Sequence, residues 1–87
     1  MQEDKLVTGD QIRAARGALN WSVRELAARS GVATATIVRY ETEVGVPKSR
    51  KDNLAMLKTA LEAAGIEFIG TPEDAPGIRI HSARPED

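Results

Sequence analysis

Cysteine is absent from this chain of 87 residues, and its aromatic residues are one Trp, one Tyr and one Phe. Without cysteine, neither a disulfide framework nor a thiolate metal site can support the fold. We therefore expect a hydrophobic core, or association with a second copy, to stabilise the chain. The scarcity of aromatic side chains excludes a stacking platform for single-stranded nucleic acid. The length is that of one small domain.

Long apolar runs are also missing, because no stretch approaches the roughly 20 residues that span a bilayer. The charged residues 1–5 are not followed by the apolar segment of a secretory signal. We expect a cytoplasmic protein without membrane contact. The one histidine, His81, has no cysteine or second histidine as a companion, and Glu73 and Asp74 fall in a predicted loop. The sequence therefore predicts no metal, no cofactor and no enzymatic activity.

Charged residues are segregated along the chain, although the formal net charge is only −1. Residues 11–58 contain nine basic residues against four acidic ones, whereas acidic residues are in excess on both flanks. A domain with one phosphate-facing surface shows this kind of segregation. The distribution favours a polyanionic partner in spite of the overall charge.

The first two of four predicted helices each begin at a capping box. Thr8 and Gln11 stand in the T-x-x-Q spacing in which both side chains satisfy backbone N–H groups, and the helix that follows is expected to end near residue 19 or 20. Ser22 and Glu25 repeat the spacing as S-x-x-E and predict a helix over residues 23–30.

Two more helices and a hairpin complete the prediction. Gly31 suits a left-handed turn, after which a short helix is expected over residues 34–42. The fourth and longest helix runs from residue 49 or 52 to residue 64, where its leucines recur at helical spacing. Residues 66–69 and 78–81 alternate apolar and polar side chains, which predicts a loose β-hairpin. We expect disorder in residues 82–87.

The segment 22–41 predicts a helix-turn-helix, because a tight glycine turn joins two short helices with inward apolar residues. Its pieces Arg-Glu-Leu-Ala, Ser-Gly-Val and Thr-Ile-Val-Arg-Tyr-Glu resemble the Xre, or lambda-repressor-like, family of transcriptional regulators. The resemblance covers about residues 8–64. It implies a mainly α fold, in which residues 1–64 form a four-helix DNA-binding domain and residues 65–81 form a C-terminal β-hairpin. Double-stranded DNA is the implied partner.

The resemblance also implies roles for individual residues. The base-reading residues fall on the exposed face of the third helix, and they are Thr34, Ala35, Thr36 and Arg39. Arginine can donate two hydrogen bonds to guanine, and threonine or alanine can contact a thymine methyl. The alternatives are a solvated Arg39 and threonines that cap the helix or bond to its backbone.

Phosphate contacts are expected from the start of the second helix and from the loop before the fourth. The predicted phosphate-binding residues are Ser22, Arg24, Lys48, Ser49, Arg50 and Lys51. The alternative for this loop is an ordinary solvated run of charges. In relatives, the positions of Arg16 and Glu41 form an ion pair that joins the first helix to the end of the third, and we expect the same pair here.

The hairpin is predicted to make the protein a two-fold dimer, because an isolated two-stranded hairpin is only marginally stable and exposes its edges. The predicted dimerisation residues are Ile66, Phe68, Ile69, Ile78 and Ile80. A dimer would set two recognition helices about 34 Å apart and predict a palindromic operator. The alternative is a hairpin that folds back on the core of its own chain.

Two other functions are compatible with the sequence. The fold can serve as a protein-interaction module that does not read DNA, and the acidic overall charge, Val23 and Ala33 favour this alternative. The protein can also be an antitoxin that represses its own operon, in which case a toxin would be its protein partner. Among regulators, we expect a repressor, because so short a chain has no room for an activation or ligand-sensing domain.

Overall fold

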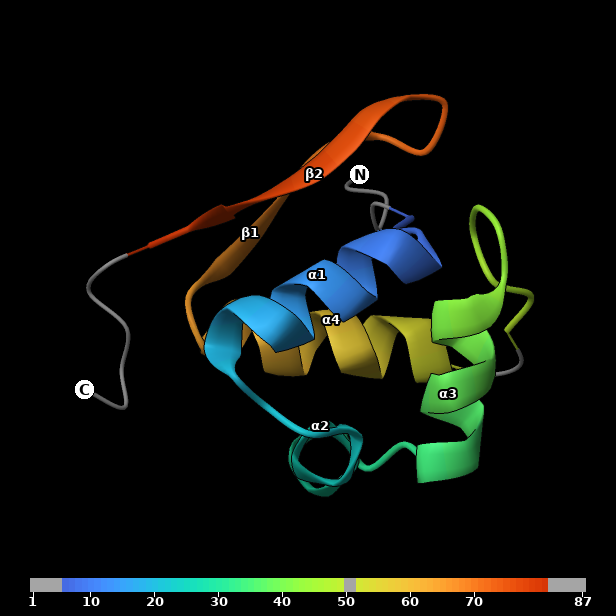
Figure 1. Ribbon diagram of the computed structural model, residues 1–87, viewed down its shortest axis with the longest axis vertical. Helices are drawn as coiled ribbons and strands as arrows, with labels where there is room; N and C mark the ends of the chain where they lie inside the picture. Colours follow the sequence, from blue (N-terminus) through green and yellow to red (C-terminus); the bar gives the residue numbers. More distant parts are fainter. Residues whose placement is uncertain (1–5, 50–51, 82–87) are drawn as a thin grey trace.

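The computed structural model of the chain describes residues 6–49 and 52–81. Its elements, in chain order, are α1 (Gly9–Leu19), α2 (Val23–Ser30), α3 (Thr34–Thr42), α4 (Asn53–Ala63), β1 (Ile66–Thr71) and β2 (Asp74–Ile80). In Figure 1, the hairpin and α2 lie on opposite sides of α1 and α4, and α3 stands near one end of both. No helix in the described ranges is both long and apolar enough to cross a membrane.

The capping box of α1 forms as predicted, whereas the second box forms only in part. The Thr8 hydroxyl accepts from the Gln11 amide at 3.1 Å, and the Gln11 side chain accepts from the Thr8 amide at 2.9 Å. At α2, the Ser22 hydroxyl accepts from the Glu25 amide at 3.0 Å. The Glu25 carboxylate does not bond back to the cap, because it pairs with Arg29 one turn later at 2.6 Å.

The helix boundaries follow the sequence closely. The bounds of α2 and α3 coincide with the predicted ranges 23–30 and 34–42, and α4 ends one residue before its predicted end. Gly31 adopts a φ of +83°, the left-handed conformation expected for the turn between α2 and α3. The cap position of α3 is occupied by Ala33, which offers no side-chain acceptor.

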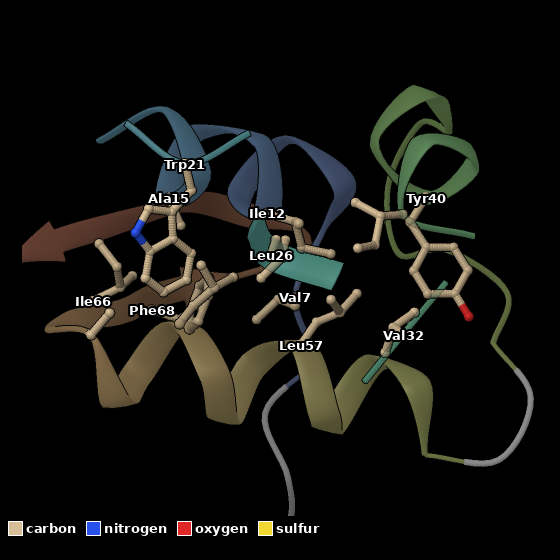
Figure 2. Close-up of a cluster of buried hydrophobic side chains, with 13 residues drawn as sticks. Val7, Ile12, Ala15, Trp21, Leu26, Val32, Tyr40, Leu57, Ile66 and Phe68 are labelled. Carbon is tan, nitrogen blue, oxygen red and sulfur yellow. The ribbon is translucent and has the colours of Figure 1, made fainter. Parts of the chain in front are cut away.

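The hydrophobic core draws side chains from every helix and from the first strand. Figure 2 shows Trp21, Ile66 and Phe68 at one end of α4 and Val32 and Tyr40 at the other. The complete cluster consists of Val7, Ile12, Ala15, Trp21, Leu26, Val32, Ile37, Tyr40, Leu57, Leu61, Ala64, Ile66 and Phe68.

The hairpin is longer and more regular than the sequence indicates. The predicted strands 66–69 and 78–81 extend toward the turn, and the pairing continues to Thr71 and Asp74. Gly70 causes the difference, because its φ of +76° allows a register shift after Ile69 without ending the ladder. The expected loose loop is therefore a bulged hairpin with a tight turn.

The hairpin folds back on the core of its own chain, and this corrects part of the predicted dimer surface. Ile66 and Phe68 are 2% and 3% exposed, so neither is available to a partner. Ile78 packs against the same core and Ile69 is half-buried, whereas Ile80 is 49% exposed. The alternation of apolar and polar residues identifies the buried face of each strand, but it does not show whether the chain's own core or a second copy covers that face. The expectation for residues 82–87 lies outside the described residues.

The approach of α1 to α3 leaves no room for a side chain at the start of α1. The Gly9 amide donates to the Gly45 carbonyl at 3.1 Å, and a Cβ on Gly9 would overlap the Tyr40 carbonyl oxygen. Gly17, on the same helix, would direct a Cβ into open space.

We predict opposite effects for alanine at these two glycines. Gly9→Ala should lower the free energy of unfolding by about 1–3 kcal/mol, because a backbone atom must move. Gly17→Ala should raise it by about 0.5–1 kcal/mol, because alanine favours a helix. Denaturant unfolding of both variants tests the pair, and equal effects would contradict the close approach of the two helices.

Candidate nucleic-acid interface

Helix α3 has one face in the core and one face in solvent. Ile37, Tyr40 and Glu41 point inward and are buried, at 0%, 0% and 6% exposure. The opposite face carries the exposed residues Thr34, Ala35, Val38, Arg39 and Thr42. An exposed helix face of this size, held by a buried opposite face, has the form that a major groove accommodates.

Three of the four predicted base-reading residues lie on the exposed face of α3, and the fourth lies beside it. Thr34, Ala35 and Arg39 are exposed, whereas Thr36 is half-buried and lines a cleft next to Lys48. Within residues 6–49 and 52–81, no hydrogen bond engages the hydroxyl of Thr34 or Thr36, so neither acts as a cap there.

Val38 belongs to the exposed face but is missing from the sequence prediction. Its side chain is 49% exposed and lies one turn after Ala35, on the same side of the helix. An isopropyl group at this position can contact a thymine methyl. The helical phase set by the inward residues Ile37 and Tyr40 is the sequence signal that would have identified it.

The Arg39 guanidinium has a defined position in the free protein. One of its Nη atoms donates to the Glu43 carboxylate at 3.0 Å, and the group lies 5.0 Å from the centre of the Tyr40 ring. The Arg39 side chain remains 52% exposed. Because a guanidinium has five N–H donors, the pair with Glu43 leaves donors for a base.

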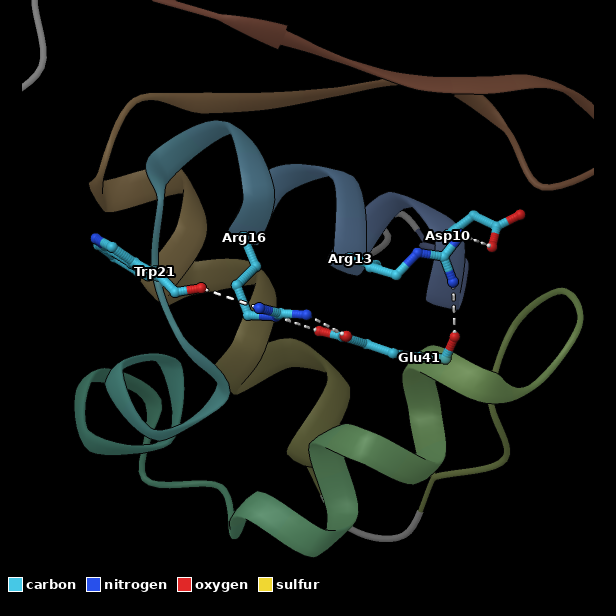
Figure 3. Close-up of polar contacts among 5 residues, drawn as sticks. All are labelled: Asp10, Arg13, Arg16, Trp21 and Glu41. Atoms are coloured by element: carbon cyan, nitrogen blue, oxygen red, sulfur yellow. Dashed lines mark hydrogen bonds and ion pairs between the residues drawn. The ribbon is translucent and has the colours of Figure 1, made fainter.

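Arg16 and Glu41 join α1 to α3 (Figure 3). The Arg16 Nε and one Nη each donate to a different oxygen of the Glu41 carboxylate at 2.8 Å. The other Nη donates to the Trp21 carbonyl at 3.0 Å, just before α2. These hydrogen bonds to Glu41 raise the pKa of Arg16 above its usual value. One guanidinium thus joins α1, the residue Trp21 before α2, and the end of α3.

Arg13 adds a second contact between the same helices. Its Nη1 donates to the Glu41 carbonyl at 3.1 Å, and its Nη2 pairs with Asp10 at 3.0 Å. The carbonyl groups in the last turn of a helix have no partner within the helix, and a cation there is favourable. The end of α3 is therefore held by both Arg13 and Arg16.

The predicted phosphate-binding residues differ in their surroundings. Ser22 caps α2 through its hydroxyl, and Ser49 is an exposed loop residue. Arg24 and Lys48 are exposed, and neither forms an ion pair with another described residue. Arg50 and Lys51 lie outside the described residues. Arg24 and Lys48 are thus cations whose charge no carboxylate in this part of the chain neutralises.

The histidine and its neighbours lie on the hairpin, away from α3. His81 contacts Glu67 at 2.9 Å, and the hydrogen bond from His81 lowers the pKa of Glu67, with a smaller contribution from Arg79. All three side chains are well exposed. In the parts of the chain that the structure describes, no group of three or more His, Cys, Asp or Glu residues is placed to hold a metal ion.

The family model described as Helix-turn-helix matches residues 12–51. The match begins within α1, contains α2 and α3, and ends just before α4. It therefore covers the Arg16–Glu41 pair and the exposed face of α3. Among curated proteins, no match was found. The family match supports a DNA-binding domain of a transcription regulator.

Loss of the Glu41 charge should destabilise the fold. Glu41→Gln replaces a carboxylate, which accepts two short hydrogen bonds from Arg16, by an amide in which one of the two groups is a donor. Arg16 is then left partly unpaired, at a site where its side chain is 21% exposed and that of residue 41 is 7% exposed. We expect a loss of about 1–3 kcal/mol in the free energy of unfolding.

The matched control is Glu25→Gln, because the Glu25–Arg29 pair is exposed at 44% on both sides. This substitution should change the free energy of unfolding by less than about 0.5 kcal/mol. Thermal or denaturant unfolding of both variants gives the comparison. Equal losses would mean that the pair between α1 and α3 has no special role.

Proposed function

Since this chain belongs, through residues 12–51, to the Xre, lambda-repressor-like helix-turn-helix family, we propose that it binds double-stranded DNA sequence-specifically. The observation that carries the proposal is the exposed face of α3, whose opposite face is buried in the core. Arg39 lies on this exposed face, and its guanidinium has N–H donors that the pair with Glu43 does not use. The same arrangement supports the four-helix lambda-repressor-like form of the domain, with the hairpin as its C-terminal addition.

In this proposal, α3 lies in the major groove. Arg39 donates to the O6 and N7 atoms of a guanine, and Thr34 contacts the next base edges through its hydroxyl or methyl group. Ala35 and Val38 supply apolar contacts to thymine methyl groups. Thr36 stands at the side of the groove, because it is half-buried toward the loop before α4.

Phosphates on either side of the groove are bound by Arg24 and Lys48, which have no ion pair with another described residue. Arg24 lies in the first turn of α2, where free backbone N–H groups and the helix dipole also attract an anion. Ser22 contacts a phosphate at the same end of α2, and Lys48 and Ser49 contact phosphates on the other side of the groove. These contacts position the protein without reading sequence. We propose a repressor, because occupancy of a promoter by such a domain is sufficient to exclude other proteins.

Selection of bound duplexes from random DNA, at two salt concentrations, tests the proposed function. The wild-type protein should return a short motif and lose affinity steeply as salt rises. A protein-interaction module would return no motif. Arg39→Ala should weaken binding to the motif by about 1–3 kcal/mol and relax one base position.

Lys48→Ala provides the contrast in the same assay. It should weaken binding to all sequences alike and reduce the salt slope by about 1, because one phosphate contact is lost. Identical behaviour of the Arg39 and Lys48 variants on the selected motif and on random DNA would contradict the two assigned roles.

We also propose that the protein acts as a two-fold dimer through the exposed part of the hairpin. Ile80 is 49% exposed at the open end of the strands and Ile69 is half-buried, and within the described residues the sheet consists of two strands. A second copy could cover Ile80 and extend the sheet at an edge. Two-fold symmetry would then present two α3 helices to a palindromic operator.

A charge at Ile80 tests the dimer without removing core residues. Ile80→Lys should give a protein that sediments as a monomer at tens of micromolar and binds a single half-site weakly. Val44→Lys is the control, because Val44 is fully exposed but lies in the loop after α3. A wild-type protein that sediments as a monomer at this concentration would refute the dimer.

A further inference from the structure

The hydroxyl of Tyr40 is a buried polar group without a hydrogen-bond partner. Tyr40 is 0% exposed, and its oxygen is the buried side-chain atom of the described residues that finds no donor or acceptor. Buried polar groups in folded proteins are nearly always paired, so an exception indicates a missing ligand or a functional role. In Figure 2, the Tyr40 ring lies at the edge of the core, on the side of the cluster opposite Trp21.

Tyr40 lines a cleft of about 380 Å³ between α3, the following loop and the start of α4. The cleft has Thr36 and Arg39 on the α3 side, Lys48 and Ser49 on the loop side, and Asn53 at the start of α4. Its lining contains no carboxylate and two cationic side chains, of which Arg39 is paired with Glu43 at 3.0 Å and Lys48 has no ion pair with a described residue. A ligand of negative charge fits this composition, whereas a cation does not.

The start of α4 offers further hydrogen-bond donors, although its cap residue, Asp52, is itself an exposed carboxylate. The cap residue of α4, Asp52, makes no side-chain hydrogen bond to the first turn, and that turn contains no acidic residue. The first backbone N–H groups of a helix have no partner within the helix and carry partial positive charge. Asn53, which lines the cleft, is the first residue of α4.

We propose that this cleft is an oxyanion site in which the Tyr40 hydroxyl donates a hydrogen bond to a phosphoryl oxygen. Lys48 supplies the charge, and Thr36 and Asn53 supply further donors. The hydroxyl is closed to solvent in the free protein, so a side chain of the cleft wall moves aside when the anion enters. The phosphoryl group is a backbone phosphate of bound DNA or a free phosphate, and the first source rests on the proposed function.

Tyr40→Phe separates this role from a structural one, because it removes only the hydroxyl. In the free protein, loss of an unpaired buried oxygen should leave the Tm unchanged or raise it by a few degrees. Affinity for the selected duplex should fall about tenfold, with the base preferences unchanged. The salt slope should also stay unchanged, in contrast to Lys48→Ala, because no charge is lost. Thr59→Val, which removes an exposed hydroxyl from α4, is the control and should bind DNA as the wild type does.

Inorganic phosphate provides the second arm. If the site accepts free phosphate, millimolar phosphate should raise the Tm of the wild type above that in chloride of equal ionic strength, and this rise should be absent in Tyr40→Phe. A loss of DNA affinity without this rise assigns the site to backbone phosphate. The proposal is overturned if Tyr40→Phe changes neither DNA affinity nor the phosphate response, or if it lowers the Tm and the affinity together. A wild type that selects no DNA motif would refute the proposed function alone, since the phosphate arm is still informative.

Discussion

The arrangement of the helix-turn-helix depends on the guanidinium of Arg16. It bonds both carboxylate oxygens of Glu41 and the carbonyl of Trp21, so that α1, the segment just before α2 and the end of α3 share one planar group. Bidentate pairs of this kind fix direction as well as distance. The neighbouring glycine contact sets how closely α1 approaches α3, because no side chain fits between Gly9 and the Tyr40 carbonyl. The contacts on the buried face of α3 therefore determine the direction in which its exposed face points.

Ion pairs within the chain determine which cations are left for the proposed contacts to DNA phosphates. Arg13, Arg16, Arg29, Arg39 and Lys58 each have a carboxylate partner within the chain. Arg24 and Lys48 have none among the described residues, and the two lie in different segments, in α2 and in the loop before α4. The sequence shows an excess of basic residues between 11 and 58. Only the structure shows which part of that excess is already neutralised.

The helices are predictable from the sequence because their ends carry local chemistry. Thr8 with Gln11, Ser22 and Gly31 each act on backbone groups within a few residues, so their spacing is sufficient to place α1, α2 and the turn to α3. The second capping box failed in its reciprocal half, because the Glu25 carboxylate had a better partner in Arg29. The S-x-x-E spacing alone does not show that Arg29 competes with the cap for the Glu25 carboxylate.

The sequence prediction differs from the structure at the exposed face of α3 and at the hairpin. It includes Thr36, which is half-buried, and it lacks Val38, which the helical phase set by Ile37 and Tyr40 places on the exposed face. The sequence assigns Ile66 and Phe68 to a partner, because strand alternation identifies a buried face but not what buries it. The cover of the hairpin is set by packing between elements far apart in the sequence.

Helix α1 connects the hairpin to α3 through polar contacts at its two ends. At its start, the Gln11 side chain accepts from the Thr8 amide and donates to the carbonyls of Ile69 and Gly77, on the two strands of the hairpin. Near its end, Arg16 holds Glu41 of α3. Because α1 is rigid and is attached at both places, it fixes the position of the hairpin relative to α3. Neither end of α1 can turn without breaking hydrogen bonds at the other end. In the proposed dimer, the pairing of two hairpins therefore determines the separation of the two α3 helices, and α1 is the element that carries this constraint.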